Sequence, residues 1–233
     1  MMEPILQCSG LCKNYSGKEA LRGLNLTIER GHIVGLLGPN GSGKSTFIKL
    51  CNGLLTPSTG TLTIAGMVPG VETKKIVSYL PERTYLSDWM RVDDVLSAFE
   101  DFYADFDKPR ALDMLQRLQI RTSDRLHTMS KGTREKVQLI LVMSRRAQLY
   151  LLDEPIGGVD PAARDYILNT IISNYDKDAT VILSTHLIAD VEKILDEVVF
   201  VSNGTIVLHT TVDEIREQQG TSVDAYFREV FKC

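Results

Sequence analysis

Several features that are scarce or missing reduce the number of protein classes to which this 233-residue sequence can belong. Its four cysteines form no disulfide or metal-binding spacing, as expected of reduced thiols in the cytosol. No apolar run approaches the roughly 20 residues of a membrane-spanning helix, and the first residues lack the basic and apolar regions of a signal peptide. Basic residues are in the minority, and the net charge of −4 disfavours nucleic acid as the main ligand. We therefore expect a globular protein with a sizeable core.

The most informative motif that is present is a glycine-rich loop of the form G-x-x-x-x-G-K-[ST]. It follows an apolar run, 33–37, that predicts a buried strand, and it precedes a helical pattern that begins near Ser45. The glycines let backbone N–H groups point at a phosphate, and the helix N-terminus adds its dipole. Lys44 is expected to reach the β- and γ-phosphates, and the Ser45 hydroxyl to face Mg²⁺. The loop consists of Gly38, Pro39, Asn40, Gly41, Ser42, Gly43, Lys44, Ser45 and Thr46.

A second nucleotide motif lies further along the chain. The apolar run 149–152 predicts a strand and ends in Asp153 and Glu154. An aspartate at such a strand end holds Mg²⁺ directly or through water, beside Ser45. Glu154 is then placed to orient and polarise the attacking water.

The distribution of glycine divides the chain. Between residues 83 and 147 only Gly132 occurs, and apolar residues there follow helical spacing, which predicts a helical subdomain. Elsewhere strand-like and helix-like segments alternate, which favours an α/β fold with a largely parallel central sheet. The expected strands are 5–8, 24–28, 33–37, 61–65, 76–80, 149–152, 181–183, 198–201 and 206–208.

Further motifs resemble those of the ATP-binding subunits of ABC transporters and occur in the same order. The run 129–133, Met-Ser-Lys-Gly-Thr, opens a helix and resembles the signature loop usually written LSGGQ. His186 resembles the switch histidine, and 157–160 matches the D-loop. Tyr15 stands where an aromatic side chain stacks on adenine, and Glu82 stands at the Q-loop. The resemblance covers essentially the whole chain.

The resemblance implies a single ABC ATPase domain over 1–233 with a P-loop NTPase fold. It implies a RecA-like nucleotide-binding core (about 1–82 and 148–233), an antiparallel β subdomain, and an inserted α-helical subdomain (about 83–147) that carries the signature loop. It also implies ATP and Mg²⁺ as ligands and ATP hydrolysis as the activity.

The family's functional residues carry over to matching positions. The catalytic residues are then Glu154, His186 and Lys44, and the metal residues are Ser45, Glu82 and Asp153. The nucleotide contacts are Tyr15, Asn40, Gly41, Ser42, Gly43, Lys44, Ser45, Thr46, Ser130 and Gly132.

The resemblance also implies two protein partners and a location. Ser130 and the N–H groups from Gly132 onward meet the γ-phosphate held by a second ATPase subunit, in a head-to-tail dimer that is homo- or heteromeric. The other partner is a transmembrane permease subunit, which would place the chain at the cytoplasmic face of the membrane.

Three positions depart from the common family pattern. Glu82 replaces the usual glutamine, which adds charge beside ATP and strengthens coordination of Mg²⁺. Lys131 replaces the first signature glycine and either adds positive charge near the opposing γ-phosphate or points into solvent. The D-loop has Gly157 and Gly158 where Ser and Ala are usual.

A narrower resemblance is to small Gram-positive export ATPases that serve phenol-soluble-modulin or antimicrobial-peptide exporters. It rests on the runs 85–90, 101–107 and 153–165. We therefore expect an exporter of amphipathic or antimicrobial peptides; the alternative cargoes are drugs, lipids or cell-envelope precursors. Four residues near the Q-loop either line the dock for the membrane subunit or pack internally: Tyr85, Leu86, Trp89 and Met90.

Other classes fit the sequence less well. Soluble ATPases of translation or DNA repair usually carry two cassettes or a long coiled-coil insert, and this sequence has neither. Many importer ATPases carry a regulatory domain after the cassette, and the sequence ends shortly after His186. A non-catalytic scaffold is disfavoured because Lys44, Asp153, Glu154 and His186 are all present.

Overall fold

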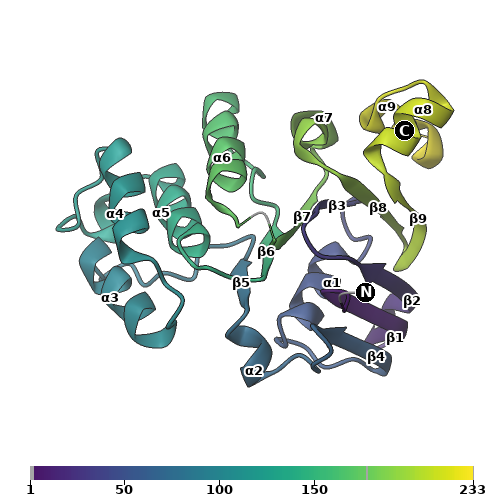
Figure 1. Cartoon of the computed structure of the whole chain (residues 1–233), viewed down its shortest axis with the longest axis horizontal. Helices are drawn as coiled ribbons and strands as arrows, with labels where there is room; N and C mark the ends of the chain where they lie inside the picture. Colours follow the sequence, from purple (N-terminus) through teal and green to yellow (C-terminus); the bar gives the residue numbers. More distant parts are fainter. Residues whose placement is uncertain (1–2, 177, 233) are drawn as a thin grey trace.

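The computed structural model describes residues 3–176 and 178–232 and contains two β-sheets with helices between and around them (Figure 1). The larger sheet is parallel except for β9, which pairs antiparallel with β8 at one edge. In spatial order its strands are β5 (Val77–Leu80), β6 (Leu149–Asp153), β7 (Thr180–Thr185), β3 (Ile33–Leu37), β8 (Glu197–Ser202) and β9 (Thr205–Thr211). The predicted α/β class with a largely parallel central sheet is confirmed.

The smaller sheet is antiparallel, with β1 (Leu6–Tyr15) between β2 (Lys18–Ile28) and β4 (Thr59–Ile64). Helix α1 (Lys44–Cys51) lies between the two sheets, and Phe47 is buried there with apolar side chains of both. This packing fixes the start of α1 relative to the end of β3.

Five helices cover the opposite face of the larger sheet, and a second apolar core lies beneath them. They are α5 (Lys131–Met143), α6 (Pro161–Asn174), α7 (Ile188–Val191), α8 (Val212–Gln219) and α9 (Val223–Phe231), with a short 3-10 turn, η2 (Glu192–Ile194), after α7. The Phe227 ring of α9 meets Phe200 of β8 edge-on at 5.2 Å between ring centroids, so the C-terminal helix is docked on the core.

The glycine-poor stretch forms a helical region with its own apolar core. It contains α3 (Val92–Phe102), α4 (Lys108–Arg117), the 3-10 turn η1 (Leu126–Thr128) and the first half of α5, and a short helix, α2 (Val71–Lys74), precedes β5. The core of this region unites apolar residues of α3, α4 and α5, as the helical spacing predicted.

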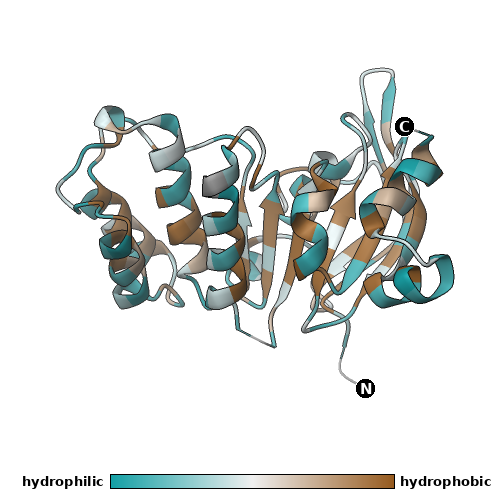
Figure 2. Ribbon diagram, turned by 90° about the horizontal axis from the view of Figure 1, so that it is seen from above, coloured by the Kyte–Doolittle hydropathy of each residue, from teal (hydrophilic) through white to brown (hydrophobic). Residues whose placement is uncertain are grey.

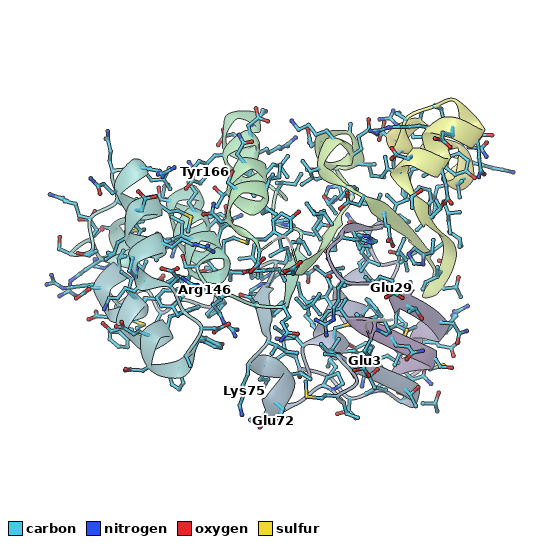
Figure 3. All side chains as sticks on the ribbon, viewed as in Figure 1. Glu3, Glu29, Glu72, Lys75, Arg146 and Tyr166 are labelled. Carbon is cyan, nitrogen blue, oxygen red and sulfur yellow. The ribbon has the colours of Figure 1, made fainter. Side chains whose placement is uncertain are left out.

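A buried arginine ties this helical region to the sheet. Arg145 is 2% exposed and forms two parallel hydrogen bonds of 3.0 Å to the Asp105 carboxylate. Its guanidinium also donates to the backbone oxygens of Val77 and Lys75. The next residue, Arg146, has a side chain that is 71% exposed and pairs with Asp107 at 2.9 Å (Figure 3 labels Arg146).

Hydropathy follows the layers, with apolar strands enclosed by helices whose outer faces are polar (Figure 2). All five residues of β3 and of β6 are buried, as expected for parallel strands that are covered on both faces. Because β5, β6, β7 and β3 are parallel neighbours, their carboxyl ends meet along one edge of the sheet. Ligands of such α/β sheets bind in the crevice outside that edge.

Candidate active site

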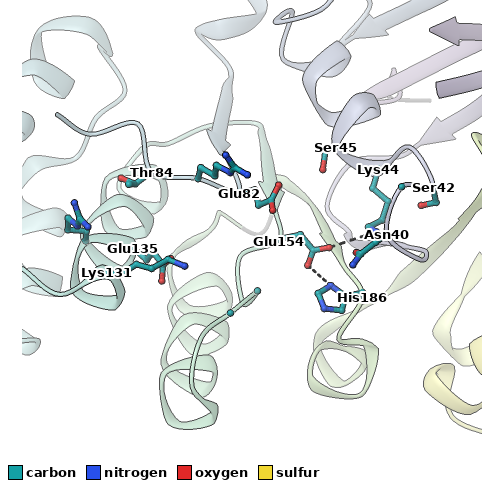
Figure 4. A pocket seen from close by; sticks show the side chains of 15 residues that line it. Asn40, Ser42, Lys44, Ser45, Glu82, Thr84, Lys131, Glu135, Glu154 and His186 are labelled. Atoms are coloured by element: carbon teal, nitrogen blue, oxygen red, sulfur yellow. Dashed lines mark hydrogen bonds and ion pairs between the residues drawn. The ribbon is translucent and has the colours of Figure 1, made fainter. Parts of the chain in front are cut away.

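Four sequence motifs meet at the carboxyl edge of the larger sheet. Glu82 follows β5, Asp153 ends β6, His186 follows β7, and the glycine-rich loop 38–46 joins β3 to α1. A cavity of about 840 Å³ opens in front of them (Figure 4). It is lined by Asn40, Gly41, Ser42, Lys44, Ser45, Glu82, Arg83, Thr84, Lys131, Arg134, Glu135, Glu154, Gly157, Gly158 and His186.

Close backbone approaches explain two glycines of the loop. A Cβ on Gly38 would lie 2.3 Å from the Val201 carbonyl oxygen. Gly43 has a φ of 112°, and a Cβ there would lie 2.8 Å from the Ala20 carbonyl oxygen. Neither position accepts a side chain without moving backbone, so the loop is held tightly between its neighbouring strands.

Lys44 is the buried cation of the site. Its side chain is 5% exposed, and the ammonium group donates to the carbonyl oxygens of Gly38 at 2.7 Å and Pro39 at 3.3 Å. Burial lowers the pKa of Lys44 below its ordinary value, and the negative charges of Glu154 and Asp153 oppose that shift. The hydroxyl of Ser42 is also buried and has no hydrogen-bond partner within the described residues. A buried polar atom of this kind normally has a partner, and an anionic ligand in the loop would supply one.

Two serines converge on Asp153, which is 1% exposed. The hydroxyl of Ser45 donates to Asp153 Oδ1 at 2.9 Å, and the hydroxyl of Ser184 donates to the same oxygen at 2.7 Å. The first contact joins the glycine-rich loop to the acidic strand, as the sequence predicted. Ser184 was not singled out in the sequence, because it belongs to an apolar strand without a motif of its own.

Glu154 has contacts on both of its carboxylate oxygens. Oε1 lies 3.8 Å from the Lys44 ammonium nitrogen, and Oε2 lies 3.1 Å from Nδ1 of His186 (Figure 4). The backbone of Glu154 has a φ of 51°, in the left-handed region that side chains rarely adopt. Backbone strain of this kind, at a residue whose carboxylate contacts both Lys44 and His186, is typical of a functional site.

The remaining predicted site residues lie outside the cavity lining. Tyr15 ends β1 and is 41% exposed, with the Lys13 ammonium nitrogen 5.4 Å from its ring centroid. Ser130 is exposed and caps α5, where its hydroxyl accepts from the Thr133 N–H at 3.2 Å. Gly43, Thr46, Gly132 and Asp153 do not line the cavity either, although Asp153 reaches it through Ser45.

The helical region contributes the other wall of the cavity. Lys131 faces the cavity from the first turn of α5 with its ammonium nitrogen 3.7 Å from Glu135, and the exposed Glu82 lines the cavity from the segment that follows β5. Among the residues considered for docking, Trp89 is 70% and Tyr85 is 51% exposed. For Leu86 a docking role is wrong, because it is 8% exposed and packs in the helical core, against which Met90 also packs.

Comparison with known proteins gives concordant matches. Residues 21–157 match the family model described as "ABC transporter". Over 93% of its length the chain is 28% identical to the linearmycin resistance ATP-binding protein LnrL of Bacillus subtilis, covering 72% of that protein. It is 29% identical to the SkfA peptide export ATP-binding protein SkfE of the same organism, over 92% of both chains. A solved ATP-binding subunit of an ABC transporter is 31% identical and superposes with a TM-score of 0.87, over 97% of this chain and 99% of that one.

The superposition confirms the expected ABC ATPase fold, including the antiparallel β subdomain and the inserted helices. None of the helices in the described part of the chain has the length and apolar character needed to cross a bilayer.

Proposed function

This chain belongs to the family of ABC transporter ATP-binding proteins, which hydrolyse ATP, and we propose that it drives an exporter of amphipathic or antimicrobial peptides. The observation that carries the motor role is the meeting of Lys44, Asp153, Glu154 and His186 at one edge of the sheet. The names of two relatives, one of peptide export and one of linearmycin resistance, support the proposal that the cargo is an amphipathic or antimicrobial peptide.

The glycine-rich loop and the start of α1 would hold the ATP phosphates. Backbone N–H groups of 38–46, the α1 dipole and the Lys44 ammonium group supply the positive potential that triphosphate needs. Ser42 would complete its hydrogen bonding with a phosphate oxygen. Tyr15, at the end of β1, offers a flat and exposed face on which adenine would stack, with a modest gain in affinity.

The oxygen atoms at Ser45 and Asp153 suit Mg²⁺, which prefers such hard ligands in octahedral geometry. These two side chains already meet at 2.9 Å, and Glu82 adds a carboxylate to the same cavity. The described residues contain no group of three or more His, Cys, Asp or Glu side chains that could hold a metal ion, so phosphate oxygens and water would complete the coordination. Bound there, Mg²⁺ would neutralise charge on the β- and γ-phosphates.

Glu154 and His186 would have different roles in hydrolysis, one toward the attacking water and the other toward the γ-phosphate. Glu154 orients the attacking water and polarises its O–H bond while water oxygen bonds to the γ-phosphorus. The bond from that phosphorus to the β–γ bridging oxygen breaks, and the proton that leaves the water passes by way of the Glu154 carboxylate to the phosphate product or to solvent, giving ADP and phosphate. His186 donates a hydrogen bond to a γ-phosphate oxygen, and Lys44 stabilises the charge that develops. The observed contacts of Glu154 with Lys44 and His186 support this grouping.

A second ATPase subunit would complete each site. Ser130 and the N–H groups from Gly132 lie at an exposed helix start, free to meet a γ-phosphate bound to another chain. We assign the nucleotide-binding core to about 1–82 and 148–233 and the helical subdomain with the signature loop to about 83–147. A membrane permease would dock beside the Q-loop, near Trp89 and Tyr85, which places the dimer at the cytoplasmic face of the membrane.

Purification of the tagged chain from detergent-solubilised membranes of its native host tests this proposal. We expect a multi-spanning protein to co-purify, and the reconstituted complex to hydrolyse ATP faster with amphipathic peptides than with lipid or drug cargoes. A Lys44→Ala variant should assemble equally well and lose the stimulated turnover. Stimulation of ATP hydrolysis by lipids or drugs alone would contradict the peptide cargo and assign a lipid or drug cargo. Purification of the chain without a membrane partner would indicate an ATPase that does not serve transport.

A further inference from the structure

Ser184 links the two acidic residues of the site. It lies in β7 beside the end of β6, where the parallel register pairs it with Asp153, and it is completely buried. Its hydroxyl donates to Asp153 Oδ1 at 2.7 Å and accepts from the Glu154 N–H at 3.1 Å. The Ser184 carbonyl oxygen accepts from that same N–H, also at 3.1 Å.

From this geometry we propose that Ser184 is a positioning residue for ATP hydrolysis, which fixes the Asp153 carboxylate and the Glu154 backbone in one arrangement. The inference rests on the proposed roles of Asp153 and Glu154. It adds a residue that touches neither nucleotide nor water and acts only through these two neighbours.

A hydroxyl is needed at position 184 because the side chain there both donates and accepts a hydrogen bond. A serine hydroxyl has one proton to donate and lone pairs to accept. Here the proton goes to Asp153, and a lone pair takes the Glu154 N–H. An alanine would leave the Asp153 carboxylate and the Glu154 N–H with one hydrogen bond fewer each. In a buried site, losing a hydrogen bond to a charged group raises the free energy of the folded site more than losing one between neutral groups.

The two contacts act on different parts of the site. Oδ1 of Asp153 receives the Ser184 and Ser45 hydroxyls together, so the carboxylate plane is fixed relative to the glycine-rich loop. Glu154 is held at a φ of 51°, a conformation that persists only where its surroundings enforce it. Its N–H donates to both the hydroxyl and the carbonyl oxygen of Ser184. The direction of the Glu154 side chain therefore depends on Ser184.

Three substitutions separate positioning from packing. Ser184→Ala removes the hydroxyl, Ser184→Cys fills nearly the same space with a weak hydrogen-bonding group, and Ser184→Thr keeps the hydroxyl. The matched control is Ser78→Ala in β5, which lies on the other side of β6 from β7, because Ser78 is 1% exposed and donates to a backbone oxygen of Val142 in α5. Thermal unfolding of each variant checks that it is folded.

The readouts are kcat, KM for ATP, and binding of a fluorescent ATP analogue with and without Mg²⁺. For Ser184→Ala and Ser184→Cys we expect kcat to fall by about 10- to 100-fold, which corresponds to loss of a hydrogen bond to a charged group. We expect the extra affinity that Mg²⁺ gives to nucleotide to shrink, metal-free binding to stay within about twofold, and Ser184→Thr to recover kcat. Ser78→Ala should keep the wild-type kcat and Mg²⁺ effect.

Two results would overturn the inference. One is a folded Ser184→Ala or Ser184→Cys variant with wild-type kcat and Mg²⁺ dependence. The other is recovery of activity by Ser184→Cys, which would assign the effect to packing. Glu154→Gln and Asp153→Asn, measured alongside, isolate the proposed function: if those variants keep full turnover, the roles of the acidic pair fail independently of Ser184.

Discussion

The ammonium nitrogen of Lys44 lies 3.8 Å from Oε1 of Glu154, and both side chains are nearly buried, at 5% and 12% exposure. The cation of the glycine-rich loop and the proposed water-orienting carboxylate therefore face each other across the site. An ATP γ-phosphate bound by Lys44 would lie within reach of a water held by Glu154.

The first prediction concerns Glu154. Glu154→Gln keeps the shape of the side chain and removes its charge, so turnover should fall by about 10²- to 10⁴-fold while ATP still binds. Light scattering should detect a dimer trapped by ATP, and phosphate release should report the lost turnover. Glu72→Gln, which removes an exposed carboxylate from α2, is the control. Wild-type hydrolysis by Glu154→Gln would refute the role of this residue.

The second prediction concerns the unusual glutamate of the Q-loop. Because Glu82 lines the same cavity as Ser45, Glu82→Gln should raise the Mg²⁺ concentration for half-maximal hydrolysis by about fivefold, the equivalent of roughly 1 kcal/mol. It should also weaken stimulation by the membrane partner. Glu72→Gln, which removes an exposed carboxylate from α2 outside the cavity, again serves as the control. Unchanged Mg²⁺ dependence together with unchanged stimulation would contradict the assignment.

The third prediction separates two residues that the sequence placed together. Leu86→Ala should lower the free energy of unfolding by about 2–5 kcal/mol, since it opens a cavity in the helical core. Trp89→Ala should change it by no more than about 0.5 kcal/mol, because the indole is exposed, but should weaken binding of the membrane subunit. Urea unfolding and co-purification measure the two effects. A Trp89→Ala variant that assembles normally would exclude Trp89 from the dock.

The fourth prediction compares adjacent arginines at the boundary of the helical region. Arg145→Ala should cost about 3–5 kcal/mol of stability, because it leaves the Asp105 carboxylate without its partner at a largely buried site. Arg145→Lys should recover only part of this, since a lysine lacks the planar fork that bonds Asp105 twice. Arg146→Ala, which removes a side chain that is 71% exposed, should cost at most about 1 kcal/mol. Equal losses at both positions in urea unfolding would contradict this.

The parts of the fold that could be predicted are those encoded by short runs. The apolar runs 33–37 and 149–152 are buried on both faces and appear as β3 and β6. By contrast, β1 was expected only at 5–8, whereas it extends to Tyr15, because its second half is held by pairing with β2 across register shifts. These register shifts break the alternation of buried and exposed residues by which a strand is recognised in a sequence.

The same limit applies to the site. Residues that are consecutive in a motif, such as Lys44 with Ser45 or Asp153 with Glu154, were found because their spacing carries the chemistry. Ser184 was missed because its importance comes from the register of β7 against β6, which the sequence does not display. Arg145 was missed for a similar reason, since its partners lie on Asp105 and on backbone oxygens that only the folded chain assembles.

The last prediction concerns the stability of the sheet edge in acid. Glu197 of β8 pairs with His209 of β9, with its Oε2 2.8 Å from Nε2, and its other oxygen pairs with His32 before β3. These contacts, the His209 hydrogen bond first, hold the pKa of Glu197 below its ordinary value of 4.5 despite partial burial. A carboxylate with a depressed pKa contributes stability that is complete above the unfolded pKa and is lost as the pH falls through the folded pKa.

Glu197→Gln should therefore lower the melting temperature most above about pH 5, and the difference from wild type should shrink as the pH falls below about 4. Glu217→Gln, at an exposed position of α8, is the matched control. Thermal unfolding from about pH 3 to 7 provides the comparison. A difference that grows towards acid pH would mean that Glu197 is protonated more readily in the folded chain than in the unfolded one, the opposite of what the two histidine contacts require.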